Sequence, residues 1–508
     1  MSICKRRRYF SFSVRIGCAA AVLSASSALA AKRHTHQLAA AQPDSHVAAT
    51  TEKVSVAIID SGVDNEHPVL IDQMWLNPGE IAANSQDDDR NAYIDDVFGW
   101  NFAERNNSII DRKYLGNFSE IPYRFFELQT KKLLGTISAE ELAWLKAAVG
   151  DPQTIQELQK FGNFVHGTHV AGIVASQSSA ANIMALKIIP TEVKLPFGKR
   201  LQELASQEHL EFPSTKESAV QGGLKKTREA VVQGILFALA QAQAVVMYDV
   251  GKYLHRQNTK IANGSFGVSS RSAQNILIPL LRLALGRKPT AAELEFYGDS
   301  FVARVVQAQS ILPDSSKKTL FVFAAGNDGA DNDLHPTSPA NIKRDNVITV
   351  AATTGTQQIA VFSNYGKKMV DVAAPGTAIR SSAPGQEFLT LSGTSQAAPF
   401  VAGVAAAMLA ENPALSPMQT KEILIKTVEK FDFLAEKVAA GGIVNHDRAV
   451  LAARLAALLP LAEAIQQSEQ TYPQGSMPRT HFAALSSGDF SDLAGNVPFV
   501  LPLPSPFR

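Results

Sequence analysis

The sequence predicts a protein of the α/β class: a three-layer, doubly wound and mostly parallel β-sheet with helical insertions. Short segments that read as strands, several of them apolar runs, recur along the chain at 54–60, 183–189, 260–267, 319–328, 347–353 and 369–376. Such continuous apolar runs are typical of strands that are buried on both faces of a sheet. Segments with helical periodicity lie between several of them, and alternating strands and helices favour parallel pairing through right-handed crossovers.

Length and charge limit the possible functions. The chain has 508 residues and is 45% hydrophobic, which is enough for two average domains or one large domain with insertions. Its 48 basic and 47 acidic residues leave a formal charge of +1, so there is no global field to attract nucleic acid or an anionic membrane. We expect no nucleic-acid partner, and we expect a monomer.

The N-terminal residues 1–30 have the organisation of a signal peptide. Basic residues Lys5–Arg8 precede an apolar stretch at Ile16–Leu23 and a small-residue cleavage site at Ala28–Ala30. The alternative is an uncleaved anchor, which the short apolar stretch disfavours. We therefore expect export to the periplasm or the extracellular space, followed by a flexible leader over 31–52.

Both cysteines, Cys4 and Cys18, fall within the predicted signal peptide. The mature chain would then contain no thiol, which excludes disulfides, a cysteine nucleophile and thiolate metal sites. No later stretch reaches about 18 uninterrupted apolar residues, so the sequence predicts no transmembrane segment in the mature chain.

The first strand, VSVAIID at 54–60, ends in an acidic residue, Asp60. Ligands of open α/β sheets bind beyond the carboxyl ends of the strands. Asp60 is thus a candidate functional carboxylate, although an Asp at this place also serves turns and caps.

An acidic loop comes next, with Asp87, Asp89, Asn91 and Asp95 in alternation and the carbonyl of Tyr93 between them. This order matches the first oxygen ligands of an EF-hand loop. Ala92 and Phe98 stand where that motif has glycine and its last acidic residue. The pattern predicts a structural calcium site, with a solvated acidic turn as the alternative.

A polar insertion at about 104–162 then leads into HGTHVAG. Within the insertion, Ser138 and Glu141 form a capping box, which marks the start of a helix, and Pro152 opens another short helix. His166 is expected at the start of a tightly packed helix, with His169 one turn later. No Glu stands between the two histidines as in HExxH metal sites, so we interpret His166 as a general base and His169 as a packed core residue.

The later strands carry two further candidates. KIANGSFG, residues 260–267, reads as a strand followed by a Gly-rich turn, and TLFVFAAGND, residues 319–328, ends near Asn327. Asn327 is either a turn residue or an amide donor for an oxyanion. Further insertions are expected at about 191–226 and 271–298, the second containing a capping box that starts at Thr290.

Ser395 lies in LSGTSQAAPFVAGVAAAM, where a Gly-Thr-Ser turn runs into a small-residue helix. Free backbone N–H groups and the positive end of the helix dipole stabilise negative charge at such a position. The alternative is an ordinary capped core helix.

Five blocks now stand in order along residues 54–411. The chain resembles the subtilisin-like serine proteases in AIIDSGVD, HGTHVAG, GSFG, AAGN and SGTSQAAP. The order Asp, His, Ser is the one known for this family. Sedolisin-like peptidases share the SGTS loop but use a carboxylate base, and the HGTHVAG block favours the histidine mechanism.

The resemblance implies roles for individual residues. Asp60, His166 and Ser395 would be the catalytic triad, and Asn327 would form the oxyanion hole with the Ser395 N–H. A strand edge would bind the substrate backbone through Ser265, Phe266 and Gly267. A separate hypothesis comes from position: because Asp328 borders Asn327, it would mildly favour a basic P1 side chain, meaning the residue before the cleaved bond. The chain would be an exported serine endopeptidase for polypeptides, with no cofactor needed for the chemistry; the alternative is a non-catalytic binding or scaffold protein whose cleft is blocked by insertions.

Several features depart from the family pattern. The interval from Asp60 to His166, 106 residues, is widened by the 104–162 insertion. The calcium loop that many members carry after the histidine helix has no counterpart here, and the leader at 31–52 is too short for a folded inhibitory prodomain. We expect a peptidase domain over 53–467, with late helices at 420–433 and 446–465, and a Pro-containing disordered tail over 468–508.

Overall fold

The computed structural model describes residues 53–193 and 220–475. The predicted signal peptide, the leader over 31–52, most of the 191–226 insertion and most of the tail lie outside the described residues.

A ten-stranded sheet forms the centre of the fold, as the predicted class requires. Its order is β13-β14-β10-β8-β6-β4-β1-β3-β2, with β9 added beside β8. The pairs from β14 to β2 are parallel, whereas β13 and β9 pair antiparallel. The strands are β1 Val54–Asp60, β2 Gly99–Asn101, β3 Ala181–Lys187, β4 Ile261–Gly264, β6 Leu320–Ala324, β8 Val347–Thr354, β9 Gln358–Ile359, β10 Val372–Pro375, β13 Glu429–Lys430 and β14 Gly442–Ile443.

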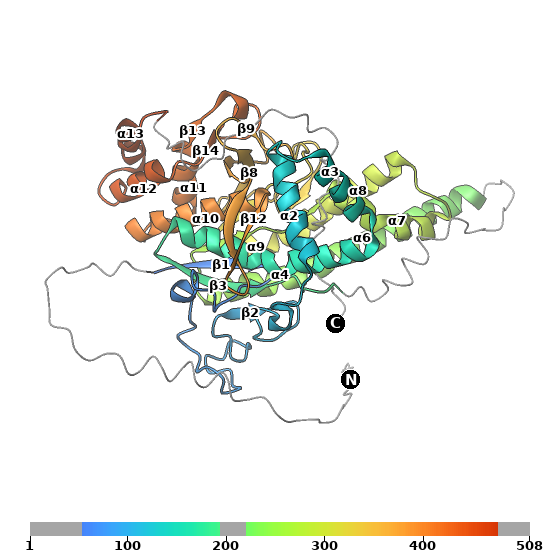
Figure 1. The fold of residues 1–508 in the computed structure, drawn as a ribbon, viewed down its shortest axis with the longest axis horizontal. Coiled ribbons are helices and arrows are strands. Elements are labelled where there is room, and N and C mark those ends of the chain that lie inside the picture. The colour runs from blue at the N-terminus through green and yellow to red at the C-terminus, as the bar shows by residue number, and fades with distance from the viewer. Residues whose placement is uncertain (1–52, 194–219, 476–508) are drawn as a thin grey trace, which may run out of the picture. The chain divides into compact units, whose positions relative to one another are not determined.

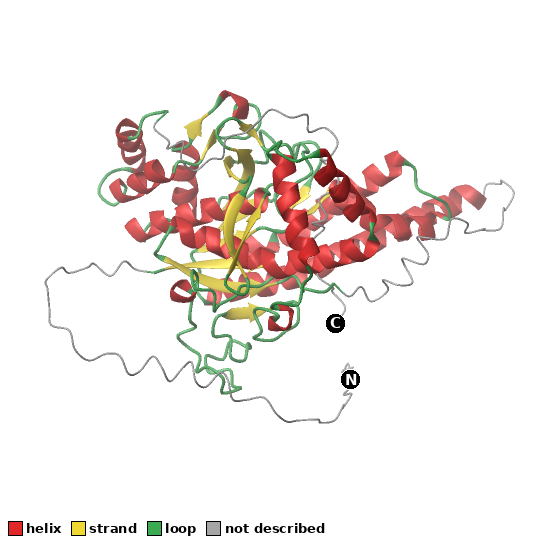
Figure 2. Cartoon of the chain, viewed as in Figure 1, coloured by secondary structure: helices red, strands yellow, loops and turns green. Residues whose placement is uncertain are grey.

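Helices cover both faces of this sheet (Figures 1 and 2). The helices are α2 Glu120–Leu133, α3 Ala139–Gly150, α4 Pro152–Gln177, α6 Val220–Arg256, α7 Ser270–Leu285, α8 Ala291–Gln309, α9 Ile311–Ser315, α10 Thr394–Glu411, α11 Pro417–Lys426, α12 His446–Leu455 and α13 Leu461–Thr471, with short 3-10 turns η1 Ile71–Gln73, η2 Arg112–Tyr114 and η3 Asp432–Leu434. Two small antiparallel pairs, β5 Val268–Ser269 with β7 Thr337–Ser338 and β11 Ile379–Ala383 with β12 Glu387–Leu391, lie outside the main sheet.

The alternation of side chains along β1 shows how the three layers are held together. Val56 and Ile58 pack in the apolar cluster that includes α4 and α10, whereas Ala57 and Ile59 pack in the cluster that includes α6. Because side chains of a strand alternate between faces, one buried strand feeds both clusters. The three-layer, doubly wound prediction is therefore confirmed.

The insertions build their own apolar clusters from helices. α2 and α3 pack on the first half of α4 through Phe125, Phe126 and Phe161. α7 and α8 pack on α6 through residues such as Leu277 and Phe301. The expected capping boxes, Ser138 with Glu141 and Thr290 with Glu293, begin α3 and α8.

Three expectations about helices were wrong. His166 does not begin a helix, because Pro152–Gln177 is one continuous helix and His166 lies in its middle. Instead of the predicted helix at 420–433, the helix α11 ends at Lys426, and the chain then forms the strand β13. The predicted helix at 446–465 is two helices, because α12 ends at Leu455 and α13 begins at Leu461 after Pro460, whose ring suits the start of a helix.

Within the described ranges, one helix, Glu229–Arg256, has the length and apolar composition to cross a bilayer, and 28% of its most apolar stretch is buried. This segment is not an uninterrupted apolar run, because it contains Gln233, Gln241 and Gln243. The criterion of about 18 uninterrupted apolar residues therefore did not identify it.

Candidate active site

Asp60 and His166 form a buried pair at the end of the first strand. Nδ1 of His166 lies 2.7 Å from Oδ1 of Asp60, and the two residues, His166 and Asp60, are 5% and 0% exposed. The same carboxylate oxygen accepts the N–H of Ser61 at 2.7 Å. The carboxylate is thus fixed by its own turn and is directed at one ring nitrogen of the histidine.

Close packing of α4 against the turn after β1 makes this pair possible. A Cβ at Gly167 would lie 2.2 Å from the carbonyl oxygen of Gly62. The Gly167 N–H also donates to Ser61 Oγ at 3.1 Å. Only glycine lets the helix backbone approach this turn so closely.

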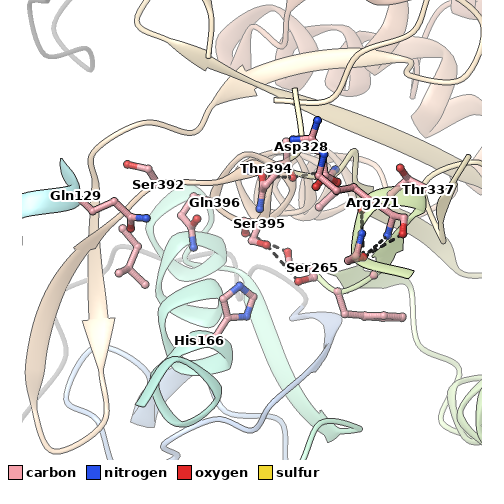
Figure 3. A pocket seen from close by; sticks show the side chains of 18 of the residues that line it. Gln129, His166, Ser265, Arg271, Asp328, Thr337, Ser392, Thr394, Ser395 and Gln396 are labelled. Atoms are coloured by element: carbon pink, nitrogen blue, oxygen red, sulfur yellow. Dashed lines mark hydrogen bonds between the residues drawn. The ribbon is translucent and has the colours of Figure 1, made fainter. Parts of the chain in front are cut away.

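Ser395 is the second residue of α10, whose N-cap is Gly393. Its hydroxyl donates to the carbonyl of Ser265 at 3.2 Å, and the hydroxyl of Ser265 donates to the Ser395 carbonyl at 3.0 Å. Figure 3 shows these two hydrogen bonds beside the ring of His166. The first turn of α10 is therefore attached to the connection after β4.

The side chain of Asn327 is oriented by the same helix start. Its Oδ1 accepts the N–H of Thr394 at 2.8 Å and the Thr394 hydroxyl at 2.9 Å. A Cβ at Gly393 would lie 2.8 Å from Gln396 Oε1, 3.4 Å from Asn327 Nδ2 and 3.6 Å from the Ser395 nitrogen. The two nitrogens thus border one small space beside Gly393, and the side-chain oxygen of Gln396 borders it too.

A cavity of about 120 Å³ contains these groups and is walled by two insertions. α2 contributes Phe126 and Gln129, and α7 contributes Arg271, Ser272 and Asn275. The remaining lining residues are His166, Ser265, Phe266, Gly267, Ser269, Ala324, Gly326, Asn327, Asp328, Thr337, Leu391, Ser392, Thr394, Ser395 and Gln396.

Comparison with known proteins agrees with this geometry. The model of the subtilase family, Peptidase_S8, matches residues 51–447. This chain belongs to the subtilase family.

Individual relatives match different shares of this subtilase. One subunit of the subtilase cytotoxin of Escherichia coli is 36% identical over 152 residues, which are 26% of this chain and 44% of that protein. Subtilisin-like protease 1 of Plasmodium berghei (strain Anka) is 24% identical over 408 residues, 79% of this chain. The matched region is 50% of the length of that Plasmodium protein. Among solved structures, a cold adapted subtilisin-like serine proteinase is 20% identical with a TM-score of 0.38, covering 78% of this chain and 88% of that chain.

The substrate-clamp residues adopt a different local structure from the one expected. Ser265, Phe266 and Gly267 line the cavity of the subtilase, but β4 ends at Gly264 and β5 begins at Val268. They form the connection between the two strands, where a Cβ at Gly267 would lie 2.2 Å from the carbonyl of Ser338. His169 is fully buried and places its Nε2 3.1 Å from the Leu389 carbonyl, as a packed residue would.

Asp328 has a charged neighbour that sequence reasoning missed. Burial raises the pKa of the Asp328 carboxyl, while a hydrogen bond from Ser269 and the charge of Arg271 lower it. Arg271 stands in the 271–298 insertion, outside every family motif. The one sequence signal for Arg271 is its position just after the cap of a helix, and that signal does not place its side chain at the cavity.

The acidic loop gathers only part of its predicted ligands. Carboxylate oxygens of Asp87 and Asp89 lie within 4.8 Å of each other and of Glu80, which the EF-hand-like pattern did not include. Asp95 instead accepts the N–H groups of Asn84 and Ser85. Asn91 donates its own N–H to Asp87 and Asp89.

Proposed function

We propose that this chain is an exported serine endopeptidase that cleaves polypeptides through an acyl-enzyme. The observation that carries the proposal is the 2.7 Å pair of Asp60 and His166, since His166 lines the same cavity as Ser395 and Asn327. A carboxylate, an imidazole, an alcohol and an amide donor together suit acyl transfer.

In the proposed reaction, Ser395 Oγ attacks the carbonyl carbon of the substrate as its proton passes to Nε2 of His166. The Ser395 hydroxyl must first turn away from the Ser265 carbonyl, to which it donates in the free protein. Such a change is expected, because catalytic hydrogen bonds often tighten only when substrate is bound. Asp60 keeps the Nδ1 proton in place and stabilises the imidazolium.

The negative charge on the carbonyl oxygen is stabilised by Asn327 Nδ2 and the Ser395 N–H, the two nitrogens that border the space above Gly393. His166 then gives its proton to the leaving amine, and water hydrolyses the ester on Ser395 by the same route.

A fluorophosphonate probe tests the proposal directly. We expect the probe to label the parent chain on Ser395 and to leave the Ser395→Ala variant unlabelled. Ser176→Ala is a matched control that should keep its labelling, because Ser176 is an exposed serine of α4 whose hydroxyl bonds only within its own helix, to Ile173 and Gln177.

The alternative is a non-catalytic binding protein whose cleft is blocked by insertions. Both insertions contribute to the cavity walls, so the alternative makes a distinct prediction. A chain that shows a cooperative thermal unfolding transition but takes up no probe would favour the binding protein.

Two further proposals extend predictions from the sequence, the second with Glu80 in place of Asn91 and Asp95. Export is tested by the N-terminal sequence of the mature protein, which we expect to begin at Ala31. A structural calcium ion held by oxygens of Glu80, Asp87 and Asp89 is tested by a rise in the unfolding temperature with calcium, which Asp89→Asn should reduce.

A further inference from the structure

A second group of metal-ligating side chains lies outside the catalytic cavity. Glu295 and Asp299 stand one turn apart on α8, and His335 stands in the connection before β7. One ligand atom from each of the three residues lies within 4.8 Å of the others. We propose that Glu295, Asp299 and His335 bind a divalent transition metal of the zinc class.

One distance in this group matches that of a formed site. Nδ1 of His335 lies 3.4 Å from Oδ2 of Asp299. Ligand atoms at about 2.1 Å from a tetrahedral zinc ion are roughly 3.4 Å apart. This pair is already at that separation, whereas Glu295, an exposed side chain with a ligand atom within 4.8 Å of the other two, would move closer on binding.

A further hydrogen bond orients the central carboxylate. The hydroxyl of Ser270, the first residue of α7, donates to Oδ1 of Asp299, which leaves Oδ2 directed toward His335. Carboxylates that bind metals are commonly held by such outer hydrogen bonds, and loss of one costs about 10 to 100-fold in affinity.

The local charge favours a cation. Glu295 and Asp299 are like charges at i and i+4, which destabilise a helix when nothing compensates them. Within 53–193 and 220–475, the ion-pair partner found for Asp299 is His335, and no Lys or Arg ion pair is found for Glu295. A divalent ion would offset both carboxylates.

The ligand types select the metal. Two carboxylates, one imidazole and an open fourth position fit Zn²⁺, Co²⁺ or Ni²⁺. Ca²⁺ prefers six to eight oxygen ligands. The acidic loop offers only oxygen ligands, from Glu80, Asp87 and Asp89, and should prefer Ca²⁺ to Zn²⁺. The two groups can therefore be compared within one chain.

The proposed metal would connect α8, which begins in the 271–298 insertion, to the cavity wall. Asp299 belongs to α8, Ser270 precedes the cavity residue Arg271, and His335 lies two residues before the cavity residue Thr337. Metal binding would therefore fasten α8 to the two segments that also form the wall near Asp328.

The test is a calorimetric titration of the full chain carrying Ser395→Ala, which prevents self-cleavage, after dialysis against a chelator. We expect one tight zinc ion per chain, at least tenfold weaker binding in Glu295→Gln and Asp299→Asn, and loss of this site in His335→Ala. Ser270→Ala should weaken it by about 10 to 100-fold. Millimolar calcium should not compete.

His446→Ala is the matched control. His446 also stands beside a carboxylate, with Nδ1 3.1 Å from Asp447, but no third ligand accompanies it among the described residues. We expect this variant to bind zinc like the parent. The Co²⁺ complex provides a second measurement, because a tetrahedral visible spectrum should appear in the parent and disappear in His335→Ala. Absence of a zinc site in the parent, or equal zinc affinity in folded His335→Ala, would overturn the assignment.

Discussion

The amide of Asn327 has two ends with separate tasks. Oδ1 accepts from Thr394 at the start of α10, and Nδ2 borders the space above Gly393. We predict that Asn327→Gly lowers kcat by about 10² to 10³, because a donor to the oxyanion is lost. The measurement is steady-state hydrolysis of a peptide ester.

Asn327→Asp separates the two tasks of this amide. It keeps an acceptor for Thr394 but replaces the donor with an acceptor, so turnover should fall at least as far as in Asn327→Gly. If Asn327→Asp kept the parent kcat, Asn327 would serve only the helix start and the oxyanion assignment would be wrong.

Asp328 and Arg271 give the cavity wall a pair of opposite charges. We predict that Asp328→Asn shifts the ratio of cleavage after Lys to cleavage after Glu toward Glu, and that Arg271→Ala shifts it toward Lys. A charge near a partly buried P1 side chain is worth about 1 kcal/mol, or roughly fivefold. A peptide library cleaved by the three chains checks the direction, and shifts of the same sign in both variants would contradict it.

Residues within the family motifs could be identified from sequence, whereas their neighbours could not. AIIDSGVD contains a strand end and SGTSQAAP a helix start, and HGTHVAG contains a histidine beside small residues that allow close packing. Arg271 and Gln129 come from insertions that have no motif, and Glu295, Asp299 and His335 are brought together only by the packing of α8 against β7. Contacts between distant segments depend on tertiary structure, which local patterns do not contain.

At the scale of elements, α4 and α6 contain glycines with opposite environments. A Cβ at Gly167 of α4 would lie 2.2 Å from the Gly62 carbonyl, whereas at Gly234 of α6 nothing lies within 4 Å. We predict that Gly167→Ala lowers the free energy of unfolding by about 1–3 kcal/mol through overpacking. Gly234→Ala should raise it by about 1 kcal/mol, since alanine favours an exposed helix interior.

Urea unfolding of the two glycine variants in the Ser395→Ala background provides the measurement. Equal effects of the two substitutions would show that the close approach of α4 to the Gly62 turn does not matter for stability. The error in predicting α4 has a related cause: a helix was expected to start at HGTHVAG, but residues 152–165 contain no proline after position 152 to end the helix that begins there.

At the scale of the whole molecule, the sheet could be predicted better than its additions. Strands such as 54–60 and 347–353 are buried on both faces of the sheet. Their nearly continuous apolar sequence therefore identifies them as strands. The two-residue strands β13 and β14 were missed because their pairing depends on neighbours far along the chain. The C-terminal helices pack around Arg448, which is fully buried and donates to Glu429 at 2.9 Å and to the Val428 carbonyl at 2.8 Å, an arrangement that no local pattern indicates.

The last prediction concerns acid stability of the whole fold. His169 joins α4 to β12 through the Leu389 carbonyl, and burial lowers the pKa of its imidazole to about 3. The unfolded chain takes up this proton near pH 6.5. His169 therefore contributes fully above that pH, and its contribution falls as the pH drops toward 3.

Between pH 7.5 and pH 4, this uptake should cost the parent about 3 kcal/mol relative to His169→Gln, which keeps a donor for Leu389 but does not titrate. The measurement is the difference in free energy of unfolding between the two chains, by urea titration at each pH in the Ser395→Ala background. We expect the parent's advantage to shrink or reverse as the pH falls. A difference that stays constant from pH 7.5 to pH 4 would mean that His169 is protonated in the folded protein as readily as in the unfolded chain, and that its buried contact with β12 does not limit acid stability.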